Sequence, residues 1–181
     1  MEVPGEHAPT LLQRLWPLRL MIFDVDGVLT AGSLHYGGEG ERYKTFHVLD
    51  GQGLVWLRQS EVTVAILSGR RSEAVRRRAL ELGIEAVLEG VEDKRAALDE
   101  LLDRLGRSRR ETGFMGDDVI DIPVMRRVGF AATVPHAANG VAAHAHWMST
   151  RAGGHGAVRE LAELILSAQG KLEGLMARYL D

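Results

Sequence analysis

Acidic residues collect in two short segments of the chain, each directly after an apolar run. Asp24 and Asp26 follow the run 20–23, and Gly27 comes next. A second acidic group follows the weaker run 112–115 and consists of Asp117, Asp118 and Asp121. In an open α/β sheet, ligands bind at the carboxyl ends of the strands. If the two runs are neighbouring strands, these carboxylates converge at one edge of the sheet.

Carboxylates crowded in this way repel one another, and a bound divalent cation neutralises them. Ligands that are all oxygen atoms favour magnesium over zinc or copper. Asp118 has a second interpretation, since an aspartate before Val119 could simply cap a helix. Asp121 is expected to support the ligands and not to bind the cation itself.

The segment Ser68-Gly69-Arg70 could seat a phosphate. It ends a second apolar run, 62–67, and opens a predicted helix. A small hydroxyl and a backbone N–H at a helix start attract an anion. Arg70 adjoins Ser68, and we expect it to reach the substrate. Lys94 opens another predicted helix, and its spacing alone favours a solvated surface residue.

Short apolar runs alternate with amphipathic stretches, a pattern typical of βαβ units. Strands are predicted at 20–23, 62–67, 86–88, 112–115, 130–134 and 147–148. Helices are predicted around 54–58, over 75–82 before Gly83, over 97–105 before Gly106, over 119–128 and over 158–166. Near-continuous apolar strands suit a parallel sheet that is buried on both faces. The predicted fold class is therefore α/β, a doubly wound, Rossmann-like and mostly parallel sheet.

The segment 32–48 interrupts this alternation. It contains Gly37, Gly38 and Gly40 between two stretches with aromatic residues, which predicts a β-hairpin inserted directly after the first strand. These aromatic residues are too few for a core of their own, so we expect the hairpin to pack on something else.

Composition excludes several classes of protein. The chain of 181 residues is 45% hydrophobic and 26% charged and has no cysteine, which excludes disulfide frameworks and thiolate chemistry. Its formal net charge of −3 argues against nucleic-acid binding. No apolar run approaches the length of a membrane span, and the N-terminal region does not look like a signal peptide. We therefore expect a cytoplasmic protein that binds neither nucleic acid nor membrane.

Together the motifs resemble those of the haloacid dehalogenase superfamily of phosphotransferases. The run 24–30 looks like its first motif, Ser68 its second, Lys94 its third and the segment 116–121 its fourth. The resemblance implies that Asp24 attacks phosphorus and carries the phosphoryl group as an aspartyl-phosphate. It also implies that Asp26 protonates the leaving alkoxide and then activates water.

The same resemblance implies binding roles for the remaining residues. Magnesium (Mg²⁺) would be held by Asp24, the backbone carbonyl of Asp26 and Asp117. The phosphoryl oxygens would be bound by Ser68, Gly69 and Lys94, which moves Lys94 from the surface into the site. Supporting positions behind them would be Thr30, Asp118 and Asp121. Arg151 lies beside flexible glycines, and we expect it to contact a sugar-acid carboxylate.

Longer matches point to a branch of the superfamily that lacks a cap domain and forms tetramers. They are the segments 40–46, 50–53, 68–70, 116–121 and 151–160. The branch implies a homotetramer, in which four hairpins assemble centrally and a neighbour covers the site. It also implies a phosphorylated sugar acid as the substrate, with eight carbons and a place in bacterial lipopolysaccharide synthesis.

Two alternatives stay open at this point. One is a phosphatase for a nine-carbon sugar acid of the sialic or deaminated sialic acid type, and the other is a non-catalytic assembly module of the same fold. The predicted domain plan has an N-terminal extension, 1–18, and a single phosphatase domain, 19–181. Within that domain the hairpin occupies about 32–48 and a glycine-rich tail segment 151–181.

Overall fold

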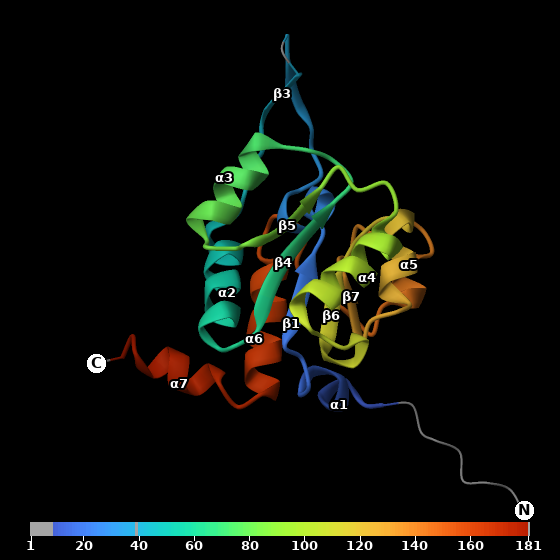
Figure 1. The fold of residues 1–181 in the computed structure, drawn as a ribbon. Helices are drawn as coiled ribbons and strands as arrows, with labels where there is room; N and C mark the ends of the chain where they lie inside the picture. Colours follow the sequence, from blue (N-terminus) through green and yellow to red (C-terminus); the bar gives the residue numbers. More distant parts are fainter. Residues whose placement is uncertain (1–8, 39, 181) are drawn as a thin grey trace, which may run out of the picture.

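The computed structural model describes residues 9–38 and 40–180, and its centre is a six-stranded sheet (Figure 1). The strands run in the order β5-β4-β1-β6-β7-β8, and every neighbouring pair is parallel. Their bounds are Leu20–Phe23 (β1), Thr63–Ser68 (β4), Ala86–Glu89 (β5), Thr112–Met115 (β6), Phe130–Thr133 (β7) and Trp147–Met148 (β8). The predicted α/β class and the six predicted strands are confirmed.

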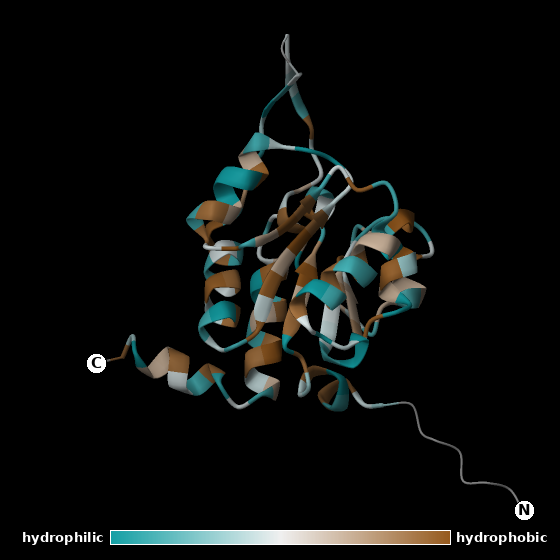
Figure 2. Cartoon of the chain, viewed as in Figure 1, coloured by the Kyte–Doolittle hydropathy of each residue, from teal (hydrophilic) through white to brown (hydrophobic). Residues whose placement is uncertain are grey.

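Helices cover both faces of the sheet. One face carries α2 (Val48–Gln59), α3 (Glu73–Glu81) and α6 (Ala157–Ala168), and the other carries α4 (Lys94–Leu105) and α5 (Ile122–Met125) (Figure 1). The hydropathy colouring shows the apolar strands enclosed between them (Figure 2). Short helical turns lie in the connections between these helices and strands. They are η1 (Val25–Leu29), η2 (Arg109–Glu111), η3 (Val119–Asp121) and η4 (Val141–His144).

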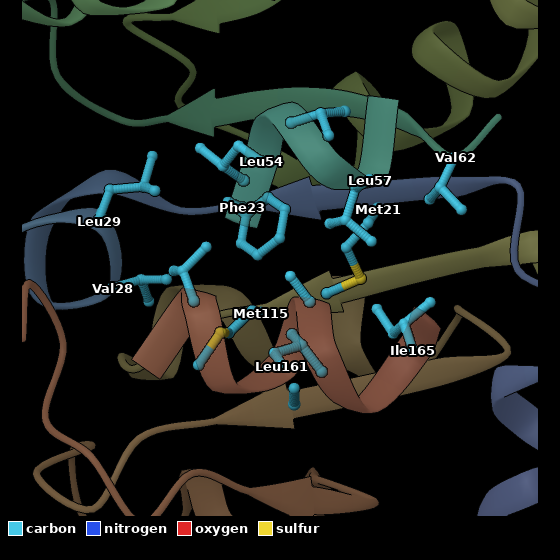
Figure 3. Packing of buried hydrophobic residues seen from close by; sticks show 14 of the residues in the cluster. Met21, Phe23, Val28, Leu29, Leu54, Leu57, Val62, Met115, Leu161 and Ile165 are labelled. Atoms are coloured by element: carbon cyan, nitrogen blue, oxygen red, sulfur yellow. The ribbon is translucent and has the colours of Figure 1, made fainter. Parts of the chain in front are cut away.

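The central strand explains why its sequence is apolar throughout. Successive side chains of a strand point to opposite faces. Met21 and Phe23 pack with α2 and α6 in one cluster (Figure 3), while Leu20 and Ile22 pack with α4 in the other. All four are fully buried. Burying each such side chain stabilises the fold by about 1.5–3 kcal/mol, so β1 is fixed rigidly where its carboxyl end enters the site.

The predicted helix over 119–128 is wrong in its extent. The structure divides it into η3 and the single turn α5. Pro123 has no backbone N–H, so it cannot donate to the carbonyl of Val119 as a continuous α-helix requires. The presence of Pro123 in the sequence is therefore sufficient to predict this break in the helix.

The inserted hairpin consists of β2 (His35–Gly37) and β3 (Gly40–Tyr43), paired antiparallel. It projects from the end of the sheet at which β1 and β4 finish (Figure 1). Tyr36 and Tyr43 are both more than half exposed. The predicted hairpin is confirmed, although its strands are shorter than the segment 32–48, and Val48 already begins α2.

The first and last described helices lie at the opposite end of the sheet. α1 (Leu11–Leu15) begins with a capping box between Thr10 and Gln13, and α7 (Leu172–Ala177) follows α6. The side chain of Gln169 donates to the carbonyls of Leu15 (3.2 Å) and Leu18 (3.0 Å), which ties α1 to the end of α6. The domain boundary at residue 18 stays a prediction. None of the described helices combines the length and the apolar character needed to span a membrane.

Candidate active site

Three carboxylates meet at the carboxyl ends of β1 and β6. Asp24, Asp117 and Asp121 each bring an oxygen to within 4.8 Å of the others. β1 and β6 are neighbours with Phe23 opposite Met115, and the Asp24 N–H donates to the Met115 carbonyl (3.0 Å). The two acidic segments therefore converge as the sequence predicts, but Asp26 and Asp118 are not among the three carboxylates that meet.

Gly27 allows the backbone after β1 to approach the Asp117 carboxylate closely. Its φ is +94°, and a Cβ built on it would lie 2.0 Å from Oδ2 of Asp117. Only a residue without a side chain fits both the backbone conformation and this space. The turn after β1 thus folds directly beneath the Asp117 carboxylate.

Lys94 lies at the centre of the cluster. Its ammonium donates to Oδ1 of Asp24 (2.7 Å) and to Oδ1 of Asp121 (2.6 Å), and the residue is 4% exposed. Asp93 places it there, because its carboxylate caps α4 by accepting from the N–H groups of Arg95 (2.9 Å) and Ala96 (3.2 Å). The surface position that spacing alone favoured for Lys94 is wrong.

Burial dominates the electrostatics of these groups. It raises the pKa of Asp24 to about 6, against the opposing charge of Lys94 and with a further rise from Asp121. It raises the pKa of Asp117 to about 7, with further rises from Asp24, Asp121 and Asp118. Burial by itself would lower the pKa of Lys94, but Asp24 and Asp121 raise it overall. The cluster therefore holds more negative charge than its lysine compensates.

A cation fits this site. Oδ1 of Asp117 is buried and has no hydrogen-bond partner among the described residues. Buried acceptors almost always have partners, so an orphan among converging carboxylates marks a place for a positive ligand. The donor atoms are all oxygens, which suits magnesium.

Asp121, Asp118 and Thr30 hold the loops in place. Asp121 is fully buried; while its Oδ1 accepts from Lys94, its Oδ2 accepts from the N–H groups of Asp117 (3.0 Å) and Asp118 (3.1 Å). Asp118 is exposed and accepts from the Val119 N–H (2.7 Å), as a cap does. Thr30 donates to the Val25 carbonyl (3.3 Å) and closes the turn after β1. The supporting roles of these three residues stay a prediction.

The segment after β4 lies beside the first motif. β4 pairs with β1, and Ser68 is buried at its end, where its Oγ accepts from the Arg70 N–H (3.3 Å). Gly69 is exposed. The Arg70 guanidinium lies 3.8 Å from Oδ2 of Asp26 and contacts the Tyr36 hydroxyl. The structure thus brings Ser68 and Arg70 to the site, with Arg70 on the Asp26 side.

One positively charged side chain at the site, that of Lys44, was not predicted from the sequence. The Lys44 ammonium donates to Oδ1 of Asp26 (2.6 Å) and lies 3.0 Å from Oε2 of Glu41, and its side chain is 2% exposed. Lys44 follows β3 in the hairpin segment, 18 positions after Asp26. No spacing rule connects the two, because the contact depends on how the hairpin folds back.

The glycine-rich segment packs on the turn after β1. A Cβ at Gly153 would lie 1.7 Å from the Gly27 carbonyl, and the Gly154 N–H donates to the Val28 carbonyl (2.9 Å). Asp50 of α2 accepts from the Gly156 N–H (3.1 Å) and thereby holds the segment from its other end. The segment therefore fixes the first motif from behind.

Arg151 begins this segment and is exposed. Its backbone N–H donates to Ser149 (3.0 Å), and its side chain runs beside Gly156. The structure does not bring its guanidinium into the carboxylate cluster through any contact among the described residues, and its expected role at a substrate carboxylate stays a prediction.

The sequence is similar to those of known hydrolases and phosphatases. Residues 84–161 match the model of a family described as haloacid dehalogenase-like hydrolase. The 3-deoxy-D-manno-octulosonate 8-phosphate phosphatase KdsC of Yersinia pestis is 43% identical over 170 residues, which are 94% of this chain and 91% of that protein.

Solved structures show the same likeness. A probable YrbI family phosphatase from Pseudomonas syringae has a TM-score of 0.92 and 49% identity, covering 94% of this chain and 97% of that one. The 3-deoxy-D-manno-octulosonate 8-phosphate phosphatase of Moraxella catarrhalis has a TM-score of 0.90 and 40% identity, covering 93% and 97%. That structure is a complex with magnesium, phosphate and Kdo, the sugar acid of the phosphatase's name.

Proposed function

Because the chain belongs to the family of 3-deoxy-D-manno-octulosonate 8-phosphate (Kdo 8-phosphate) phosphatases, within the haloacid dehalogenase-like hydrolases, we propose that it hydrolyses Kdo 8-phosphate to Kdo and phosphate in lipopolysaccharide synthesis. The observation that carries the proposal is the buried contact of Asp24 with Lys94 beside Asp117. A carboxylate held next to an ammonium and a cation site is suited to attack a phosphate ester. The same contacts argue against a non-catalytic module.

Magnesium would be held by Asp24, Asp117 and the backbone carbonyl of Asp26. When bound, it supplies positive charge to the transferring phosphoryl group. Ser68, Gly69 and Lys94 would bind the phosphoryl oxygens. These contacts are valuable because phosphoryl transfer relies mainly on positioning and on neutralising charge.

In the first step an Asp24 oxygen attacks phosphorus, and the bond from phosphorus to the sugar oxygen breaks. Asp26 gives its proton to the departing alkoxide, which leaves as the sugar hydroxyl. The phosphoryl group is now an acyl phosphate on Asp24. Proton transfer of this kind contributes roughly 10²- to 10⁴-fold to a rate.

In the second step water attacks the phosphorus of the aspartyl-phosphate. Asp26, now a carboxylate, takes a proton from that water, and the bond from Asp24 to phosphorus breaks. Inorganic phosphate leaves, and Asp24 and Asp26 return to their starting states. Both steps thus depend on one carboxyl group that works first as an acid and then as a base.

Substitution of the nucleophile tests the mechanism. Asp24→Asn keeps the shape but removes the attacking oxygen, so phosphate release should fall by at least about a thousandfold. Phosphate release that survives this change would refute the assignment.

A comparison of substrates tests the name of the sugar. We expect kcat/KM for Kdo 8-phosphate to exceed that for the 9-phosphates of sialic acid and deaminated sialic acid. If Kdo 8-phosphate trailed by about a hundredfold, a difference of about 2.7 kcal/mol in transition-state binding, the nine-carbon alternative would be correct.

We propose further that the chain forms a homotetramer with its hairpins at the centre. Support comes from the projecting hairpin, whose Tyr36 and Tyr43 are 60% and 52% exposed in the single chain. Light scattering should give a mass four times that of one chain, and a monomeric mass would refute the assembly. A cytoplasmic location is proposed from the absence of cysteine and would be tested by cell fractionation.

A further inference from the structure

Asp26 is held by the inserted hairpin and by the loop after β4. Lys44 donates to its Oδ1 (2.6 Å), and the Arg70 guanidinium lies 3.8 Å from its Oδ2. Each oxygen of the Asp26 carboxyl group therefore faces a positively charged side chain. The shorter of the two contacts is that of Lys44, which belongs to the hairpin segment.

The Lys44 ammonium is itself fixed from a second direction. Glu41 lies 3.0 Å from it, and the other Glu41 oxygen accepts from the Ser72 hydroxyl at the start of α3. This chain of contacts joins the hairpin, the first motif and the loop after β4. Such a network holds a long lysine side chain in one geometry, whereas an isolated surface pair does not.

Lys44 is more deeply buried than Arg70, the other positively charged side chain beside Asp26. Its side chain is 2% exposed, while that of Arg70 is 43% exposed. A buried ammonium that already faces two carboxylates has little freedom to rotate toward a substrate. A contact of 2.6 Å, by contrast, fixes the direction in which the Asp26 carboxyl points.

We propose that Lys44 is a positioning residue for proton transfer, which holds the Asp26 carboxyl in line with the leaving oxygen through the network of Glu41 and Ser72. The proposal rests on the proposed function, since it assigns Asp26 the proton that the alkoxide receives. Its distinctive consequence lies in the first step, where Lys44 matters only if the leaving group needs that proton. The attack of water in the second step is common to all substrates and does not enter kcat/KM.

The test compares two leaving groups in Lys44→Met. The alkoxide of Kdo 8-phosphate needs a proton, whereas nitrophenolate leaves from p-nitrophenyl phosphate without one. We expect kcat/KM, which reports the first step, to fall about a hundredfold for Kdo 8-phosphate and to change less than about threefold for p-nitrophenyl phosphate. Lys44→Arg, which keeps a donor, should recover part of the loss.

Two further variants separate positioning from folding. Glu41→Gln leaves Lys44 in place but weakens its anchor, so it should show the same selectivity for leaving group with a smaller loss. Lys171→Met is the matched control, because Lys171 contacts the Ser60 carbonyl away from the site and should leave both rates unchanged. Thermal unfolding of each variant checks that it is folded.

The possible outcomes test the role of Lys44 and the identity of the substrate separately. Equal losses of kcat/KM on both substrates, or no loss on either, would overturn the role of Lys44. If the wild-type enzyme hydrolysed p-nitrophenyl phosphate but not Kdo 8-phosphate, the proposed substrate would be wrong. The Lys44 comparison would then be made with the sugar-acid phosphate that is hydrolysed, so the two failures are distinguishable.

Discussion

The two sides of the site are built in different ways. On the nucleophile side Asp24, Lys94 and Asp121 are each less than 10% exposed, and they lie beyond the carboxyl ends of strands of the main sheet, β1, β5 and β6 respectively. On the other side, Asp26 is held by a projecting hairpin whose Tyr36 is 60% exposed. In the proposed mechanism this difference separates two tasks, since covalent chemistry would use the rigid sheet, while proton transfer would depend on an insertion.

The energy that an ion pair contributes should depend on how deeply the pair is buried. Removing one partner of a buried ion pair costs about 3–5 kcal/mol, because a charge is left without compensation. Exposed pairs contribute at most about 1 kcal/mol. Substitutions can test this contrast directly.

The largest effect is expected for Lys94→Met. It leaves Asp24 and Asp121 buried without their cation, so the free energy of unfolding without metal should drop by about 3–5 kcal/mol. The melting temperature should fall by about 10 °C. Lys171→Met, whose partner Glu61 is 88% exposed, should cost less than about 1 kcal/mol. Equal melting temperatures of the two variants would show that the buried contacts of Lys94 contribute no more than an exposed pair does.

The next effect concerns pH and magnesium. The pKa values of Asp24 and Asp117 in the folded chain are about 6 and about 7, above their ordinary value of 3.8. The folded state thus binds protons that the unfolded state releases, so stability without metal should fall as pH rises from about 4 to about 7.

Magnesium competes with those protons. It should therefore raise the melting temperature more at about pH 8 than at about pH 5, and EDTA should abolish both the rise and the activity. Asp117→Asn should flatten the pH dependence and remove the magnesium response. Full activity in chelator would contradict the metal site.

An intermediate effect is expected where backbone packs on backbone. In Gly153→Ala the new Cβ would lie 1.7 Å from the Gly27 carbonyl, so the two segments must move apart at a cost of about 1–3 kcal/mol. Gly174→Ala is the control, because no atom of residues 9–38 or 40–180 lies within 4 Å of its Cβ position in α7. Calorimetry should show the control unchanged or stabilised by up to about 1 kcal/mol.

The smallest effect is expected on the hairpin. Tyr36→Phe removes the hydroxyl that contacts Arg70, and in the single chain this should change stability by less than about 0.5 kcal/mol. Thermal unfolding at several protein concentrations provides the measurement. A larger loss that depends on concentration would show that the hairpin is buried between subunits, which would sharpen the contrast between the two sides.

The positions of Asp24 and Asp117 were predictable from sequence because the rules that locate them are local. Apolar runs mark buried parallel strands, and the carboxyl end of each run locates Asp24 and Asp117 at one edge. The break of the predicted helix 119–128 was equally predictable from Pro123. These features need no knowledge of contacts between distant segments.

Contacts across long stretches of chain could not be predicted from the residues alone. Lys94 is 70 positions from Asp24, and its spacing resembles that of an ordinary surface lysine. Asp50 accepts from the Gly156 N–H, 106 positions away. Only the resemblance to a family placed Lys94 in the site, and nothing in the sequence pointed to Lys44 as a partner of Asp26.

The contact between Gly153 and Gly27 limits what can be learned from comparing related sequences. Neither position has a side chain to exchange for a larger or smaller one, so paired substitutions cannot compensate there. Methods that infer proximity from correlated changes would find no signal between these two backbone segments, although they lie in close contact. A library of random substitutions would reveal them instead, as two positions at which nearly every change is lost.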